Sequence, residues 1–361
     1  MPLKAILDGK QIIGELMDFQ EWKELKKAVK EKAVSLTLPC CHEECTPCDS
    51  NHGLRFFRHK KETNCNVGKG ETLEHMLLKA CILRGCRYAH YEVEAEKEGD
   101  GWRADVFATN GKSKVAFEVQ WSPQTYEETV ERQKKYEDSH VRGVWLFRKM
   151  PDQTVSSTDV KLKRYIPMFQ VDWETVEWDK SKRPKILGFD VETFAQELLL
   201  GHLVPRNRIR LEPVQVIRLD IAETNCHRCH RNYHIFHVDE SPRVDVHGKK
   251  HYYGWDDLFP NGVDYSPVVV DALNAYKRTA RGSKYKIGEI KPRYSHTEKK
   301  SYMSQGCPYC DALNGRFYLE MEWHHLKVVG HLHLAIPIPE GSTIKGKHWC
   351  HSENNDFCPD E

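Results

Sequence analysis

The most regular alternation of apolar and polar residues lies between residues 70 and 149. Leu73, Leu77, Ala80 and Leu83 recur at helical spacing, which predicts a helix that ends at Gly85. Alternating runs that follow it are typical of strands. The expected order is that helix, strands near 88–95, 102–109 and 114–121, a helix capped by Ser122 with Pro123 at its first position, and a strand over 142–149.

The flanking segments have weaker patterns. A short hairpin should precede a helix that Asp18 caps, and residues 190–203 should form another helix. Beyond a Pro- and Arg-rich boundary at 204–218, strands and loops alternate with one helix at 266–280. We therefore expect three domains, over residues 1–68, 69–205 and 206–361.

Composition narrows the class of protein. The 361 residues are 39% hydrophobic and 30% charged, which describes a folded chain long enough for separate cores. A net charge of +1 limits any nucleic-acid surface to a local patch. The start lacks the apolar core of a signal peptide, and no segment is apolar enough to span a membrane, so we expect a cytoplasmic protein without a membrane partner. Its 13 cysteines then indicate zinc rather than disulfides.

The stretch "WRADVFATNGKSKVAFEVQW" (102–121) carries carboxylates inside two strand-like runs. Asn110-Gly111 predicts a two-residue turn in which Thr109 faces Lys112 and Asp105 lies opposite Ala116. Asp105, Glu118 and Gln120 then share one face of the hairpin, where two carboxylates can bind one divalent cation. The alternative is a sheet with one solvated face. Glu74, beside the apolar stripe of the preceding helix, is expected to supply a third carboxylate, which favours the cation.

This arrangement resembles a known nuclease fold. A Glu, an Asp and then Glu-x-Gln within helix, three strands, helix and strand look like the PD-(D/E)XK nuclease core, an αβββαβ unit in an α+β protein. The segments "ETLEHMLLK", "WRADVFA", "VAFEVQWS" and "ERQKKY" with "GVWLF" resemble the competence protein CoiA family. "LPCCHEEC" and "GLRFFRHKKETNC" also match the family's metal-binding lead-in, so the resemblance covers about residues 36–148.

The resemblance implies metal-dependent cleavage of DNA phosphodiesters. Glu74, Asp105 and Glu118 would hold Mg²⁺ or Mn²⁺. Gln120 stands where the wider superfamily has a lysine, so it can orient a water or a phosphate oxygen but adds no positive charge. Arg132 and Tyr136, one turn apart on the next helix, are candidates for phosphate contact, against the alternative of an ordinary solvated face.

Two structural zinc sites are expected. Cys226-x-x-Cys229 and Cys307-x-x-Cys310 have the form of two zinc knuckles, which together supply four thiolates. In the first domain, the family resemblance favours the set Cys40, Cys41, His59 and Cys65. Local spacing alone would favour the C-x-x-C pair Cys45 and Cys48. At the end of the chain, a third set is open to metal binding, comprising His348, Cys350, His351 and Cys358.

Residues 277–300 hold nine Lys or Arg against two Glu, with Tyr285 and Tyr294 interleaved. Such a segment can neutralise phosphates while its tyrosines stack on bases, although a solvated linker has the same composition. The residues assigned to DNA binding here are Lys277, Arg278, Arg281, Lys284 and Lys286.

Two functions compete at this point. The first is a DNA nuclease that processes incoming or foreign DNA, in competence or in anti-phage defence, with possible protein partners in that process. The second is a zinc-containing accessory protein that keeps the nuclease fold and binds DNA without cutting it. Three converging carboxylates would favour the enzyme.

Overall fold

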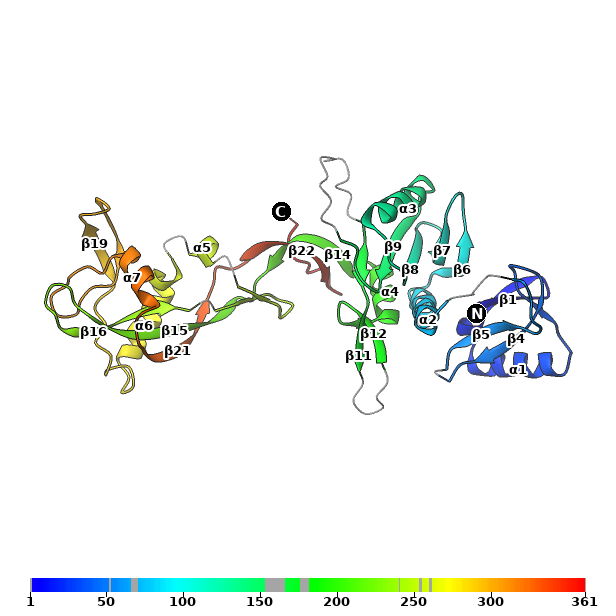
Figure 1. The fold of residues 1–361 in the computed structure, drawn as a ribbon, viewed down its shortest axis with the longest axis horizontal. Helices are drawn as coiled ribbons and strands as arrows, with labels where there is room; N and C mark the ends of the chain where they lie inside the picture. Colours follow the sequence, from blue (N-terminus) through cyan, green and yellow to red (C-terminus); the bar gives the residue numbers. More distant parts are fainter. Residues whose placement is uncertain are drawn as a thin grey trace. The chain divides into compact units, whose positions relative to one another are not determined.

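The computed structural model describes residues 2–51, 53–65, 71–152, 166–175, 182–239, 241–252, 255–259 and 262–360. The chain divides into two compact units, Met1–Leu203 and Val204–Glu361, and each mixes helices with a larger share of strands (Figure 1). None of the helices in these ranges has the length and apolar character needed to cross a membrane.

The first unit begins with a small sheet covered by a helix. The strands are β1 (Lys4–Leu7), β2 (Lys10–Ile13), β3 (Leu36–Thr37), β4 (Glu44–Asp49) and β5 (Arg55–His59), in the order β2-β1-β3-β4-β5. Helix α1 (Phe19–Lys30) follows a 3-10 turn at Gly14–Leu16 and places Trp22 and Leu25 against Phe57. The expected cap is confirmed, because Asp18 accepts a hydrogen bond from the Glu21 N–H while Glu21 accepts one from Asp18.

The central part of this unit has the expected order of helix, three strands, helix and strand. The elements are α2 (Leu73–Tyr88), β6 (Glu92–Glu98), β7 (Arg103–Thr109), β8 (Lys114–Gln120), α3 (Tyr126–Asp138) and β9 (Arg142–Phe147). With β10 (Met168–Gln170) the strands form a sheet in the order β10-β9-β8-β7-β6. β8, β9 and β10 are parallel neighbours, and β6, β7 and β8 are antiparallel ones.

Both predicted helix ends in this region were wrong. Helix α2 continues past Gly85, and a side chain at this glycine would lie 2.2 Å from the Glu192 carbonyl oxygen, so the glycine serves a close approach to α4 (Val191–Leu200). Helix α3 is capped by Thr125 rather than Ser122, because Thr125 and Glu128 exchange two hydrogen bonds.

The predicted register of the hairpin was also wrong. Thr109 pairs with Lys114, and Phe107, not Asp105, lies opposite Ala116. Asn110 lengthens the turn because its side-chain oxygen accepts hydrogen bonds from the backbone N–H groups of Lys112 and Ser113. Because the register moves by two residues, one full pleat period, the predicted faces of β8 are unchanged relative to β7.

The remainder of the unit is a small sheet beside α4. It contains β11 (Asp172–Thr175), β12 (Lys182–Ile186) and β13 (Phe189–Asp190), in that order. The helix expected at 190–203 is confirmed as α4. Gly201 follows its last residue, and a φ of 82° at this glycine suits the residue that terminates a helix.

The second unit is built on a long strand, β15 (Val214–Asn225), between β16 (Asn232–Val238) and β21 (Val328–Pro337). Helix α6 (Pro267–Lys277) lies within the helix expected at 266–280, is capped by Ser266, and packs Val269 and Leu273 against this sheet. The further elements are β14 (Leu203–Arg210) paired with β22 (Thr343–His351), the hairpins β17 (Arg243–Val244) with β18 (Lys250–His251) and β19 (Lys291–Ser295) with β20 (Lys300–Ser304), a 3-10 turn at Val263–Tyr265, and the helices α5 (Trp255–Leu258) and α7 (Arg316–Trp323). The expectation of one helix in this unit was therefore wrong.

Candidate functional site

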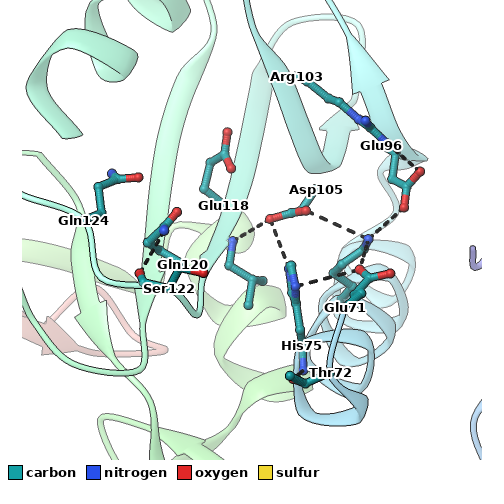
Figure 2. Close-up of polar contacts among 12 residues, drawn as sticks. Glu71, Thr72, His75, Glu96, Arg103, Asp105, Glu118, Gln120, Ser122 and Gln124 are labelled. Atoms are coloured by element: carbon teal, nitrogen blue, oxygen red, sulfur yellow. Dashed lines mark hydrogen bonds and ion pairs between the residues drawn. The ribbon is translucent and has the colours of Figure 1, made fainter. Parts of the chain in front are cut away.

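A pocket of about 460 Å³ lies where β7 and β8 meet the beginning of α2 and the side of α3. Figure 2 shows Asp105 between the strand that carries Glu118 and the helical turn that carries His75. Twelve residues line the pocket: Glu71, His75, Lys79, Glu96, Arg103, Asp105, Glu118, Val119, Gln120, Trp121, Ser122 and Arg132. Most of these side chains are charged or polar, so the pocket suits a charged ligand rather than an apolar one.

Asp105 is held by groups from α2 and β8. Its Oδ2 accepts a 2.8 Å hydrogen bond from the Val119 N–H, so the carboxylate takes a place that a backbone carbonyl would fill in a continuous ladder. Lys79 Nζ lies 3.9 Å from Oδ1, and His75 Nε2 lies 3.5 Å from Oδ2. Burial opposes ionisation of Asp105, but these neighbours keep its pKa below the usual value. Asp105 is therefore a carboxylate at neutral pH.

Glu118, on the adjacent strand, has different partners. It is only 4% exposed, Arg132 Nη2 lies 2.8 Å from its Oε2, and the Tyr136 hydroxyl donates to its Oε1. Burial and then the charge of Asp105 raise the pKa of Glu118 to about 7, although Arg132 and Tyr136 act in the opposite direction. Two neighbouring acids in one pocket thus differ in protonation, which is typical of functional sites.

The raised pKa predicts a pH-dependent stability. Between pH 4.5 and about 7, the folded protein keeps a proton on Glu118 that the unfolded chain has lost, so the free energy of unfolding falls as the pH rises through this window. Glu118→Gln should remove this contribution, roughly 3 kcal/mol between about pH 5 and about pH 8. Urea unfolding in buffers without added divalent cations measures it. Glu74→Gln, a change at an exposed carboxyl group, is the control, and equal pH dependence in both variants would contradict the assignment.

Glu74 does not join the pocket. It is exposed at the start of α2, and the pocket receives Glu71, His75 and Lys79 from this part of the chain instead. The helix begins at Leu73 with Thr72 as its cap, so Glu71 precedes the helix, while His75 and Lys79 lie one turn apart on the face that meets the sheet. Lys79 is 2% exposed and contacts Glu71 at 2.7 Å and Glu96 at 2.9 Å. The predicted contribution of Glu74 was therefore wrong.

The structure places the other predicted residues of the pocket as follows. Gln120 donates to the Ser122 carbonyl oxygen at 2.9 Å and accepts a hydrogen bond from Arg132, so it lies at the pocket wall. Arg132 lines the pocket with a side chain that is 36% exposed. Tyr136 is 1% exposed and packs on Trp102 and Trp145, so the prediction that it contacts phosphate was wrong. Its hydroxyl supports Glu118.

The pocket offers ligands for a cation, but they are not drawn together. No group of three candidate ligand atoms within 4.8 Å of one another includes Glu74, Asp105 or Glu118 in the described part of the chain. His75 Nε2 is shielded from solvent there and makes no hydrogen bond. The pocket thus contains a buried His75 nitrogen that is 3.5 Å from Asp105 but makes no hydrogen bond, an ionised Asp105, and a Glu118 whose charge Asp105 disfavours. A divalent cation bound by these three side chains would stabilise this arrangement.

Residues 71–220 match the family model described as the nuclease-like domain of competence protein CoiA. Over this segment the chain is similar to the CoiA family, as the sequence motifs indicated. The matched segment begins at Glu71 and contains all twelve residues that line the pocket. None of the curated proteins compared matches the chain.

The four predicted cysteines of the second unit converge. Cys226 Sγ lies 3.5 Å from Cys310 Sγ, and Cys229 Sγ lies 3.6 Å from Cys307 Sγ. Burial opposes ionisation of Cys226, but the N–H groups of Cys229 and Arg228 lower its pKa to about 6. A thiolate is the form that binds metal, so this four-cysteine cluster can hold zinc.

The first unit holds a second cluster. Cys40, Cys41 and Cys65 lie within 4.8 Å of one another, and His59 Nε2 is 3.3 Å from Cys41 Sγ. This is the set that the family resemblance implied. The alternative pair does not take part: Cys45 is buried beside Trp22 and Phe57, and Cys48 contacts Thr46.

The basic segment at 277–300 is partly structural. Tyr285 is 9% exposed and belongs to the core of the second unit, so its predicted stacking on bases was wrong, whereas Tyr294 is 54% exposed. Lys277 is half-buried at the end of α6, and burial lowers its pKa. Four of the predicted residues are exposed and leave a smaller basic surface: Arg278, Arg281, Lys284 and Lys286.

Proposed function

We propose that this CoiA-like protein is a metal-dependent DNA nuclease with a PD-(D/E)XK core in residues 69–205, flanked by a zinc module at 1–68 and a zinc-containing domain at 206–361. The observation that carries the proposal is the pocket itself. Asp105 and Glu118 come from neighbouring strands and line the same pocket as His75, whose buried Nε2 lies 3.5 Å from Asp105 and makes no hydrogen bond. The match to a nuclease-like domain supports the same reading.

Asp105, Glu118 and His75 would hold the cation, and two carboxylates suit Mg²⁺ or Mn²⁺. Such an ion polarises a phosphate oxygen, lowers the pKa of a bound water and stabilises the leaving oxygen. Lys79 keeps Asp105 ionised from a position 3.9 Å away. Its contacts with Glu71 and Glu96 fix the ammonium group, so it is a positioning residue for Asp105.

Arg132 can exchange partners during substrate binding. In the structure its Nη2 pairs with Glu118 at 2.8 Å, and its Nη1 contacts Gln124 at 2.7 Å. When Glu118 turns toward a cation, the guanidinium group keeps donors for a phosphate oxygen, for which its planar fork is suited. Gln120, next to Arg132, can orient a water or a phosphate oxygen through its amide.

A second candidate is a DNA-binding accessory protein that does not cut. The observation that favours it is the engagement of Glu118 with Arg132 and Tyr136, which directs this carboxylate away from a shared cation site. Gln120 also adds no charge to the pocket. In either case the chain would act on incoming or foreign DNA, during transformation or in defence.

Purified protein incubated with DNA and Mg²⁺ or Mn²⁺ separates the two candidates. The nuclease predicts cutting that requires the added ion, and the accessory protein predicts retention of DNA without cutting. Retention with intact DNA under all ion conditions would therefore reject the nuclease.

The exposed part of the basic segment should contribute to DNA binding in both cases. A triple variant tests this contribution: Arg281→Gln, Lys284→Gln and Lys286→Gln. It is expected to bind DNA about tenfold more weakly and with a smaller salt dependence, because fewer counterions are released from the DNA when phosphate contacts are lost. Fluorescence anisotropy over a salt series measures this. Lys23→Gln, Lys27→Gln and Lys30→Gln on α1 make the same change in charge elsewhere, and an equal loss of affinity would indicate a nonspecific effect.

A further inference from the structure

A third group of metal-ligating side chains lies in the second unit, away from the four-cysteine cluster. His247, His348, Cys350 and Cys358 have ligand atoms that all lie within 4.8 Å of one another. His247 Nε2 is 3.7 Å from Cys350 Sγ and 3.6 Å from Cys358 Sγ. The geometry points to a third zinc site, which ties the last residues of the chain to the turn between β17 and β18.

His348 gives this group its clearest sign of a missing ligand. Both of its ring nitrogens are shielded from solvent, and neither makes a hydrogen bond among the described residues. Its ring centroid lies 5.3 Å from that of His247. A metal ion bound by the two imidazoles and the two thiols would give a His348 nitrogen the partner that it lacks.

The strand geometry explains which tail residues take part. His348 and Cys350 are two residues apart on β22, so their side chains share a face, whereas His351 points to the other face and is not in the group. The sequence had suggested His348, Cys350, His351 and Cys358 as a possible metal-binding set. In the structure His247, about a hundred residues earlier in the chain, takes the place of His351 in this set.

The turn that carries His247 is held in place by hydrogen bonds that do not depend on a metal ion. The buried Asp245 accepts hydrogen bonds of 2.9 Å from the N–H groups of His247 and Lys249, and His251 Nε2 contacts its other oxygen at 2.7 Å. Gly248 completes the turn with a φ of 78°. The imidazole therefore reaches the cysteines with little loss of conformational entropy on binding.

The sulfur atoms also have the surroundings of metal-bound thiolates. The Cys358 N–H donates to Cys350 Sγ at 3.2 Å, and the Arg210 N–H donates to Cys358 Sγ at 3.3 Å. The four-cysteine cluster shows the same pattern, because the Arg228 N–H lies 3.4 Å from Cys226 Sγ. The Arg210 side chain holds the tail itself through Asp356 and the Phe357 carbonyl oxygen. Backbone donors to sulfur stabilise its charged form.

Two nitrogens and two sulfurs favour tetrahedral Zn²⁺ over Mg²⁺ or Ca²⁺, which prefer oxygen ligands. Cys350 and Cys358 are 1% and 3% exposed, so the site is closed by protein on the sulfur side, and we assign it a structural role. The alternative is that no metal ion binds and that Cys350 and Cys358 form a disulfide.

Zinc content of the purified full-length protein tests the proposal. His247→Asn changes an exposed turn residue and should fold normally, and we expect it to contain one zinc ion fewer per chain than the parent. Cys358→Ser should lose the same single ion. His333→Asn, on the exposed side of β21, is the matched control and should keep the full content.

A second readout separates metal loss from misfolding. With Co²⁺ in place of zinc, the visible spectrum of the parent should contain a component from two nitrogen and two sulfur ligands, which His247→Asn removes, while the components of the four-cysteine cluster and of the cluster with Cys40, Cys41, Cys65 and His59 stay. Equal zinc content in the parent and both variants would overturn the assignment. A disulfide between Cys350 and Cys358 that persists in a reducing buffer would overturn it as well.

Discussion

Asp105→Asn is expected to lower Mg²⁺- or Mn²⁺-dependent DNA cleavage by at least about 100-fold, because a cation ligand in such a site is worth several kcal/mol of transition-state stabilisation. The amide retains an oxygen that can accept the hydrogen bond from the Val119 N–H, so the first part of β7 should keep its position. The negative charge beside Lys79 and His75 is lost. Initial rates of plasmid nicking over a series of metal concentrations measure the effect.

The control for this variant is Asp100→Asn, which removes an exposed carboxylate in the turn between β6 and β7. It should cut DNA at the parent rate. Thermal unfolding and DNA retention should be similar in both variants, which separates a lost catalytic group from a lost fold. Unchanged cleavage by Asp105→Asn would show that the nuclease activity, if present, does not use this pocket.

Local sequence signals predicted the structure correctly where a residue type or a short motif has one common structural role. Asp18 caps its helix as predicted, and the alternation in β8 places Glu118 on the face away from Phe117. The C-x-x-C knuckles also met as expected, since four thiols at such spacing have few other uses in a folded chain.

The third acidic residue of the pocket could not be placed in this way. The difference between Glu74 and Glu71 depends on where α2 begins, and the cap at Thr72 sets this within one residue. A shift of three residues on a helix exchanges neighbours on nearly the same face, so the apolar stripe alone does not distinguish them. A usable signal was Lys79, a charged residue inside the apolar run "HMLLKAC", which only acidic partners could allow to be buried.

Contacts between distant segments were the other limit. Asn110-Gly111 suggested a two-residue turn, but the Asn110 side chain bonds two backbone N–H groups and produces a longer one. The partner of the tail cysteines, His247, has no local motif, because its position follows from the pairing of β14 with β22 and from the docking of the β17–β18 turn. Such pairings depend on the tertiary fold rather than on residue spacing.

Cys307→Ser is expected to have the largest effect on stability. Cys307 is 2% exposed, lies 3.6 Å from Cys229 Sγ, and packs with Tyr233 and Ile235 in a small apolar cluster. This cluster holds the turn after β15 to the segment before α7, and little apolar area is available to replace the metal there. The variant should lose one zinc ion, and the melting temperature of the second unit should fall by roughly 10 °C or more.

Cys48→Ser is the matched control for this experiment, because Cys48 lies outside every cluster of candidate ligands in the described residues. It should keep its zinc and its melting temperature. Calorimetry together with metal analysis measures both variants, and a chelator added to the parent protein should lower its stability at least as much as Cys307→Ser does. If Cys307→Ser retained its full zinc content and melted with the parent, the four thiols would be packing residues, and the stability of the second unit would have to come from its apolar core alone.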